Sequence, residues 1–235
     1  MDNNRSDFDL NHHYKALLLS LIEETNEVYN QARLEDCNLY DNITISYRRN
    51  VERWYMEGEI IKAQLKRTKI EEHEQLRKGT KNYFAIYRHS GKILKVESFV
   101  NGEKDVTWHA FAHNNKRYLI PFDKDGKKQY GYRIVSELSN GFIRSEYLVN
   151  DSQICYYEYN RISVTEVSVI YINYVPRSTY PVNYCDAGIV YDGELYSQQQ
   201  EYIGYEEFKC KEKGVSYADV SIPNCIVRQN KSIHF

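Results

Sequence analysis

A phrase that recurs in the middle of the chain, between about residue 58 and residue 174, limits the possible folds more than any other feature. Its three copies lie at 58–64 (GEIIKAQ), 91–97 (GKILKVE) and 141–147 (GFIRSEY). Each copy predicts a glycine turn followed by a strand. In the first copy, apolar Ile61, Ala63 and Leu65 alternate with polar Lys62, Gln64 and Lys66. Such alternation is typical of a strand with one buried face and one solvated face.

Two-residue turn signals return between and beyond these copies. They are Ser90-Gly91, Asn101-Gly102, Asn114-Asn115, Asp125-Gly126, Asn140-Gly141 and Asn150-Asp151. Successive signals are 10 to 15 residues apart, which matches one strand plus one tight turn. Gly, Asn and Asp readily adopt the positive φ angles that hairpin turns need. The pattern therefore predicts a long antiparallel meander.

The segments that flank the repeats predict one helix and further strands. From residue 11 or 12 to about residue 34, apolar residues recur at helical spacing, so we expect an amphipathic helix that covers a face of the sheet. Residues 1–8 are polar, and we expect them to be frayed. A first strand is expected at 43–47. Residues 51–76 could form a helix or strands, and their likeness to the later copies favours strands.

These patterns predict a mainly β protein built on one long antiparallel meander. A sheet of ten or more strands must curl or split into layers, so a curved sheet, a half barrel and a sandwich are all compatible with the pattern. One N-terminal amphipathic helix should pack on this sheet. We expect three parts: residues 1–41 as helix and connector, residues 42–176 as the meander, and residues 177–235 as hairpins that extend or cap the same domain.

Charge is distributed unevenly along the chain, although the formal net charge is only -2. Residues 44–95 contain thirteen Lys or Arg and six Glu, whereas residues 178–208 contain no Lys or Arg. The second window holds six acidic residues and six Tyr. Two solvated loop regions of opposite sign would explain this pattern without any function. The functional interpretation is that the acidic, Tyr-rich surface recruits a basic partner, because carboxylates steer the encounter and Tyr rings provide contact area.

The acidic window predicts a partner-binding surface near residues 191–207. Its expected contact residues are Tyr191, Asp192, Glu194, Tyr196, Glu201, Tyr202, Tyr205, Glu206 and Glu207. A basic protein domain with a groove for phosphates, such as a nuclease toxin, would suit this surface. The basic window at 44–95 offers an alternative role as a nucleic-acid-binding module. No RRM, KH or OB signature accompanies that window, however, and Glu71, Glu72 and Glu74 interrupt it, which disfavours nucleic acid.

Residues capable of catalysis form no recognisable motif. His109 and His113 are four residues apart in an expected strand, where their Cα atoms would lie about 13 Å apart, too far to share a metal ion unaided. Cys185 has no neighbouring feature that would activate its thiol. The chain also lacks a Gly-rich phosphate loop and a His-Glu-x-x-His motif. We predict no catalytic residue, no metal and no cofactor, and keep as an alternative an enzyme whose unrecognised site uses His109, His113 or Cys185.

Cysteine usage and hydropathy predict a cytoplasmic protein. The five Cys are an odd number at irregular spacing, without a Cys-x-x-Cys pair, so neither a disulfide framework nor a zinc site is indicated. No stretch approaches the roughly 18 consecutive apolar residues of a membrane helix. The N-terminal residues MDNNR do not begin a secretory signal. We therefore expect no membrane association.

The repeated phrase, with Asn-Gly hairpins between its copies, resembles the strand-turn-strand repeats of MORN-like and Rhs-type antitoxin or immunity proteins. The resemblance covers roughly residues 58–150, under half of the chain, and the third copy keeps fewer positions of the phrase than the first two. It implies a bacterial protein that binds and neutralises a cognate toxin without catalysis of its own. We therefore expect an immunity- or antitoxin-like binding protein whose partner is a basic toxin domain.

Overall fold

The computed structural model describes residues 3–34, 40–49, 54–58, 72–140, 142–151, 153–161, 166–174, 182–191 and 194–196. These residues form one helix, α1 (Asn3–Gln31), and twelve strands. The strands are β1 (Thr44–Arg49), β2 (Glu72–His73), β3 (Tyr83–His89), β4 (Lys92–Val100), β5 (Glu103–His113), β6 (Lys116–Phe122), β7 (Arg133–Ser139), β8 (Phe142–Val149), β9 (Ile154–Arg161), β10 (Glu166–Tyr174), β11 (Val182–Tyr191) and β12 (Glu194–Tyr196).

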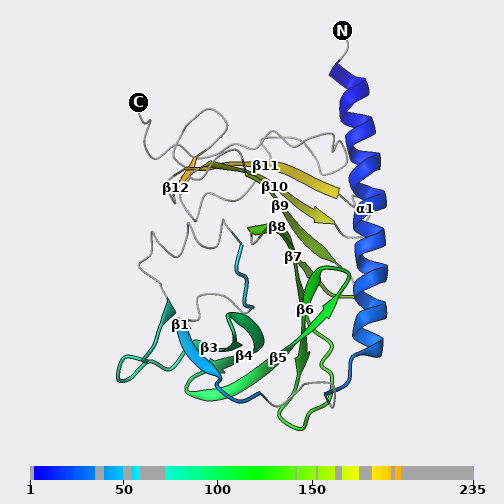
Figure 1. The fold of residues 1–235 in the computed structure, drawn as a ribbon. Coiled ribbons are helices and arrows are strands. Elements are labelled where there is room, and N and C mark those ends of the chain that lie inside the picture. Colours follow the sequence, from blue (N-terminus) through cyan, green and yellow to red (C-terminus); the bar gives the residue numbers. More distant parts are fainter. Residues whose placement is uncertain are drawn as a thin grey trace.

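All of the described strands belong to a single antiparallel sheet. From β3 to β12 their order in the sheet follows the sequence, whereas β1 lies between β3 and β2. Figure 1 shows that the sheet curls strongly and stays open, with β1 and β12 approaching the same side of the picture. The prediction of a mainly β, curved meander is confirmed. Of the alternatives, the described strands form one curved sheet and not a two-layered sandwich.

Bulges contribute to the curl of the sheet. The pairing register shifts within the β3–β4, β4–β5, β7–β8 and β10–β11 pairs. An extra residue in one strand of a pair bends that strand and increases its twist. Repeated bulges therefore turn a meander that could be flat into a trough with an inner face and an outer face.

Three of the predicted hairpin turns have the backbone that their residues favour. Both residues of Ser90-Gly91, Asn101-Gly102 and Asn114-Asn115 have positive φ, between 47° and 86°. The hairpin turn predicted at Asp125-Gly126 is also present, with a loop longer than two residues, because Phe122 and Lys128 pair across it and Gly126 has a φ of 76°. There the Asp123 carboxylate accepts hydrogen bonds from the backbone N–H groups of Asp125 and Lys127, at 2.9 and 2.8 Å. This side chain stabilises the turn in place of a two-residue hairpin.

Helix α1 begins earlier and ends slightly earlier than predicted. Helical backbone is already present at Asn3, within the residues expected to be frayed, and ends at Gln31. No Gly or Pro interrupts the first 31 residues, so a helix that has formed around its packed centre can continue outward. At the other end, the Arg33 guanidinium donates to three carbonyl groups of residues 30–32, and the Lys128 ammonium donates to the Tyr29 carbonyl at 2.7 Å. These donors satisfy the terminal carbonyl groups.

The outer face of the sheet is covered by α1, as predicted (Figure 1). Alternate residues of β6, such as Tyr118, Ile120 and Phe122, point to the helix, whereas Leu119 belongs to the core on the opposite face. The core on the helix side consists of Leu18, Leu21, Val28, Tyr29, Ala32, Tyr118, Ile120, Phe122, Val135, Tyr147, Val149, Ile154, Tyr156 and Ile172. Central strands are therefore apolar on both faces, and each face needs its own cover.

The inner face is covered by a short segment of the same chain, Trp54–Gly58, which lies inside the curve of the sheet in Figure 1. Tyr55 and Met56 are fully buried there against Phe84, Trp108 and other residues of the inner core. The Arg48 guanidinium donates to the Met56 carbonyl at 2.7 Å and lies 4.1 Å from the centre of the Tyr55 ring. The segment therefore acts as an internal plug, and we call it the inner segment.

A buried carboxylate holds the end of the inner segment. Glu146 accepts hydrogen bonds from the backbone N–H groups of Glu57 and Gly58, and burial raises its pKa to about 7. Gly58 does not have the positive φ of the hairpin glycines. Its physical role is close approach, because an added Cβ would overlap the Tyr159 hydroxyl. The rest of the first predicted copy, at 59–64, lies outside the described residues, and so does most of 51–76.

Candidate functional site

A basic hollow opens beside β1 and β2, at one end of the sheet. Its volume is about 470 Å³. It is lined by Tyr47, Arg49, His73, Gln75, Leu76, Arg77, Lys78, Gly79, Thr80, Lys81 and Asn82. None of these lining residues is acidic. We call this site the basic hollow.

Strand pairing and one tight turn bring the walls of the basic hollow together. Tyr47 of β1 pairs with His73 of β2, and Arg49 is the last residue of β1. The chain then turns back toward β3 through residues 77–80, where the Thr80 N–H donates to the Arg77 carbonyl at 3.1 Å and Gly79 has a φ of 86°. Glycine suits this turn because other residues rarely adopt positive φ. Residues 47–49 and 73–82 thus meet, although 23 positions separate the two stretches.

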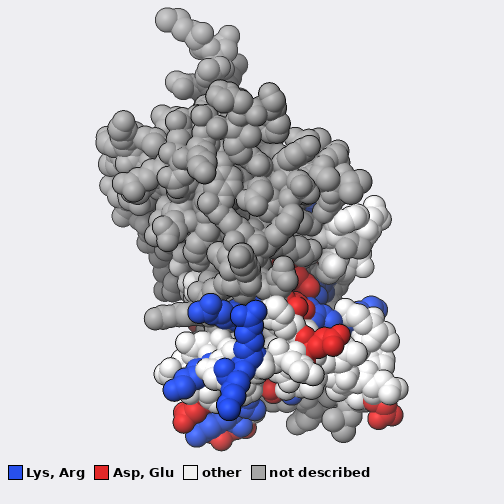
Figure 2. All heavy atoms as spheres, turned by 90° about the vertical axis from the view of Figure 1, so that its left-hand side faces the viewer, with Lys and Arg blue, Asp and Glu red and all other residues white. Residues whose placement is uncertain are grey.

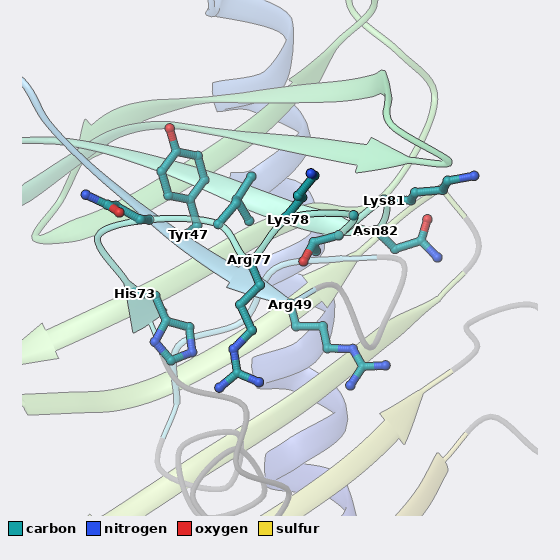
Figure 3. A pocket seen from close by; sticks show the side chains of 11 residues that line it. Tyr47, Arg49, His73, Arg77, Lys78, Lys81 and Asn82 are labelled. Carbon is teal, nitrogen blue, oxygen red and sulfur yellow. The ribbon is translucent and has the colours of Figure 1, made fainter.

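The cationic side chains of the basic hollow come from three places. Figure 3 shows His73, Arg77 and Arg49 extending to the same side, from β2, from the turn and from the end of β1. Lys78 and Lys81 extend in other directions from the turn region. The two arginines and the histidine therefore lie along one side of the hollow, and the two lysines add positive charge nearby.

The arginines of the basic hollow differ from the arginines inside the sheet. Arg88 pairs with Glu72 at 2.9 Å, Arg117 with Glu57 at 2.7 Å and Arg133 with Asp151 at 2.8 Å. Among the residues that the structure describes, no carboxylate pairs with Arg49 or Arg77. Figure 2 shows Lys and Arg side chains gathered on this face of the molecule. Within the part of the chain that the structure describes, the basic hollow therefore gathers positive charge without a paired carboxylate on either arginine.

This arrangement can bind an anion. Guanidinium groups present N–H donors in a planar fork that matches carboxylate and phosphate oxygens. Because no acidic residue lines the hollow, its lining attracts an incoming anion.

The predicted acidic, Tyr-rich surface lies partly at the opposite end of the strand order. Tyr191 ends β11 and pairs with Glu194 of β12, and Tyr196 pairs with Ile189. The remaining predicted contact residues, Asp192, Glu201, Tyr202, Tyr205, Glu206 and Glu207, lie outside the described residues. The described part of this surface therefore belongs to the last strand of the sheet, whereas the basic hollow belongs to β1 and β2.

The histidines and the cysteine of the enzyme alternative are spread over the sheet. His109 lies on β5 with its ring edge-on to Phe122, and burial lowers its pKa to about 4. His113 is exposed and contacts the Asn114 amide at 2.9 Å. Cys185 lies on β11, and five strands of the sheet order separate it from β5. In the part of the chain that the structure describes, no three His, Cys, Asp or Glu are grouped as metal ligands.

Sequence reasoning identified the basic window but missed the basic hollow inside it. The window spans residues 44–95, and only two short stretches of it line the hollow. The local signal was the Arg77-Lys78 pair with Lys81 around the Gly79 turn. What joins this turn to Arg49 is the pairing of β1 with β2 and β3, which no local pattern encodes.

Two further findings bear on the class of protein. Among the described residues, no helix has both the length and the apolar character that crossing a membrane requires. Comparisons with protein-family models, with curated proteins and with solved structures found no match to this chain. Its function is therefore inferred from its own residues.

Proposed function

We propose that this chain is a non-catalytic, immunity- or antitoxin-like binding protein that acts in the bacterial cytoplasm. Its curved sheet serves as a rigid scaffold, and the acidic, Tyr-rich segment around residues 191–207 binds a basic domain of a cognate toxin. Negative charge accelerates the encounter, and Tyr side chains provide contact area with little loss of conformational entropy.

The observation that carries this proposal is the separation of charge along the strand order. The described part of the acidic, Tyr-rich segment is β12 and the end of β11, and β12 is the last strand of the sheet. On its outer side, β12 pairs with no other described strand, and partner proteins commonly bind to such an edge strand. The basic hollow belongs to the strands at the other end of the order.

The non-catalytic part of the proposal is supported by how the polar groups inside the sheet are used. Glu146 holds the inner segment through two backbone N–H groups, and Arg117 pairs with Glu57 of the same segment. Arg133, which is almost fully buried, pairs with Asp151 and lies over the Tyr29 ring. These ion pairs and hydrogen bonds stabilise the scaffold, although the buried Nε atoms of Arg117 and Arg133 have no hydrogen-bond partner.

The test is a charge reversal in the acidic segment. The tagged full-length chain captures its partner from the native cell, and the association rate with the purified partner is then measured as a function of salt. Replacing Glu201, Glu206 and Glu207 by Lys should slow association by about tenfold or more at low salt and reduce its salt dependence, because steering charges act through the association rate.

The matched control carries the same change of charge on a different surface. Glu103, Asp105 and Asp125 are exposed, and their replacement by Lys should alter the association rate far less. The proposal is contradicted if both triple variants bind equally fast, or if the captured partner is an acidic protein.

A further inference from the structure

We propose that the basic hollow binds a small phosphorylated molecule, up to the size of a nucleotide, and that Arg49 and Arg77 hold its phosphate. This site goes beyond the protein-binding role, because it lies at the other end of the sheet order and depends on none of the residues of the acidic segment.

The first support for this site is that several cationic donors line the same side of one hollow. Arg49 and Arg77 extend from different elements to the same side of the hollow, and His73 joins them there (Figure 3). Two guanidinium groups together offer several N–H donors, which suits the tetrahedral arrangement of phosphate oxygens. Lys78 and Lys81, on the same turn region, raise the local potential without needing to touch the anion.

The unpaired state of these cations is the second support. Most charged side chains are only solvated surface. Lys92, at the start of β4, and Lys124, in a turn, are exposed examples. By contrast, the arginines of the hollow lie around one concavity without an acidic wall. The nearest acidic residue on β2, Glu72, already pairs with Arg88 and hydrogen-bonds to Ser46. Positive charges gathered around one concavity repel one another and attract an anion.

The dimensions and surroundings of the hollow favour a small ligand over nucleic acid. Pockets for small molecules are typically about 300 to 1,000 Å³, and this hollow, at about 470 Å³, lies within that range. A nucleic-acid surface would need cations in a track that follows the backbone. Here the cations surround one hollow, and the exposed carboxylates Glu72 and Glu74 stand on either side of His73. These carboxylates would repel a phosphate backbone that continued past the site.

The site is tested by titrating the full-length chain with pyrophosphate and with ADP in an isothermal calorimeter. We expect saturable binding with one ligand per chain. Arg49→Ala and Arg77→Ala should each weaken binding by about tenfold or more, because each removes a charge-assisted hydrogen bond. Arg77→Lys should weaken binding as well, since an ammonium group cannot replace the planar fork.

Arg144→Ala is the matched control. It removes one positive charge from an exposed side chain of β8, far along the sheet order from the hollow, and should change the affinity less than twofold. Circular dichroism verifies that each variant is folded.

Each outcome decides for or against the site. Tighter binding of ADP than of pyrophosphate identifies a nucleotide as the source of the phosphate, and equal or weaker binding of ADP identifies inorganic phosphates. Both results support the proposal if Arg77→Ala weakens binding by about tenfold or more. The proposal is overturned if wild-type protein binds neither ligand at millimolar concentration. It is also overturned if the arginine variants bind like Arg144→Ala, or if a single-stranded oligonucleotide binds whereas pyrophosphate does not.

Discussion

The two ends of the sheet share one architecture and carry opposite charge. At the end formed by β1 and β2, four cationic side chains surround a hollow with no acidic lining. At the end formed by β11 and β12, the chain runs from residue 178 to residue 208 without a single Lys or Arg. Both ends are antiparallel strands joined to the same continuous sheet. The same antiparallel architecture therefore carries side chains of either charge.

This difference teaches that the charges of the molecule fall into two kinds. Inside the curve, charges are paired and hold the inner segment, as Arg117 does with Glu57 and Glu146 does with backbone N–H groups. In the basic hollow, the arginine side chains have no such partners among the described residues. The paired charges inside the curve stabilise the fold. We infer that the arginines of the basic hollow, which have no such partner among the described residues, bind a ligand.

The largest effect on stability is expected from Gly58→Ala, which disrupts the packing of the inner segment against the sheet. The new Cβ would overlap the Tyr159 hydroxyl and crowd the Glu146 carboxylate, so the inner segment would have to move. We expect the free energy of unfolding to fall by about 3 kcal/mol, as measured by urea denaturation.

The control for this substitution is Gly79→Ala, in the turn that lines the basic hollow. Its Cβ would meet no atom within 4 Å, and only the positive φ of 86° opposes it. The expected loss is about 1 kcal/mol. Equal losses for the two variants would mean that the inner segment is not packed against the sheet as described.

A smaller effect is expected from removing an interior arginine. Arg117→Ala deletes the partner of Glu57 in a mostly buried position, and should lower the free energy of unfolding by about 2 kcal/mol. Arg77→Ala, at the rim, should change it by less than about 0.5 kcal/mol, because the side chain is exposed and unpaired. Chemical denaturation of both variants measures the two changes in the free energy of unfolding. If Arg77→Ala lowers it as much as Arg117→Ala does, the distinction between the two kinds of charge is contradicted.

The features that were predictable from sequence are local. Alternating residues and positive-φ pairs such as Asn101-Gly102 predict β3, β4 and β5, since each signal lies within a few residues of the turn it forms. The core on the helix side was also predictable. Leu18, Leu21 and Val28 recur at helical spacing, and an apolar sheet face has to be buried against another element.

The features that were missed depend on contacts between distant residues. Glu146 binds the N–H groups of residues 57 and 58 from nearly 90 positions away. β1 inserts between β2 and β3, and this order creates the basic hollow. A glycine predicted as a turn, Gly58, instead allows close approach of another strand. Local periodicity specifies strands and faces, but it does not specify which distant side chain will meet them.

The central claim is that this scaffold binds ligands of opposite charge at its two ends. The most direct measurement is a residue-resolved map of backbone amide shifts by NMR, recorded on one sample of the full-length chain during titration with pyrophosphate and on a second during titration with an oligolysine peptide. We predict that pyrophosphate shifts amides within residues 47–49 and 73–82, and that oligolysine shifts amides within residues 182–207. If both ligands shift the same amides, or if neither shifts these two sets, the claim is contradicted.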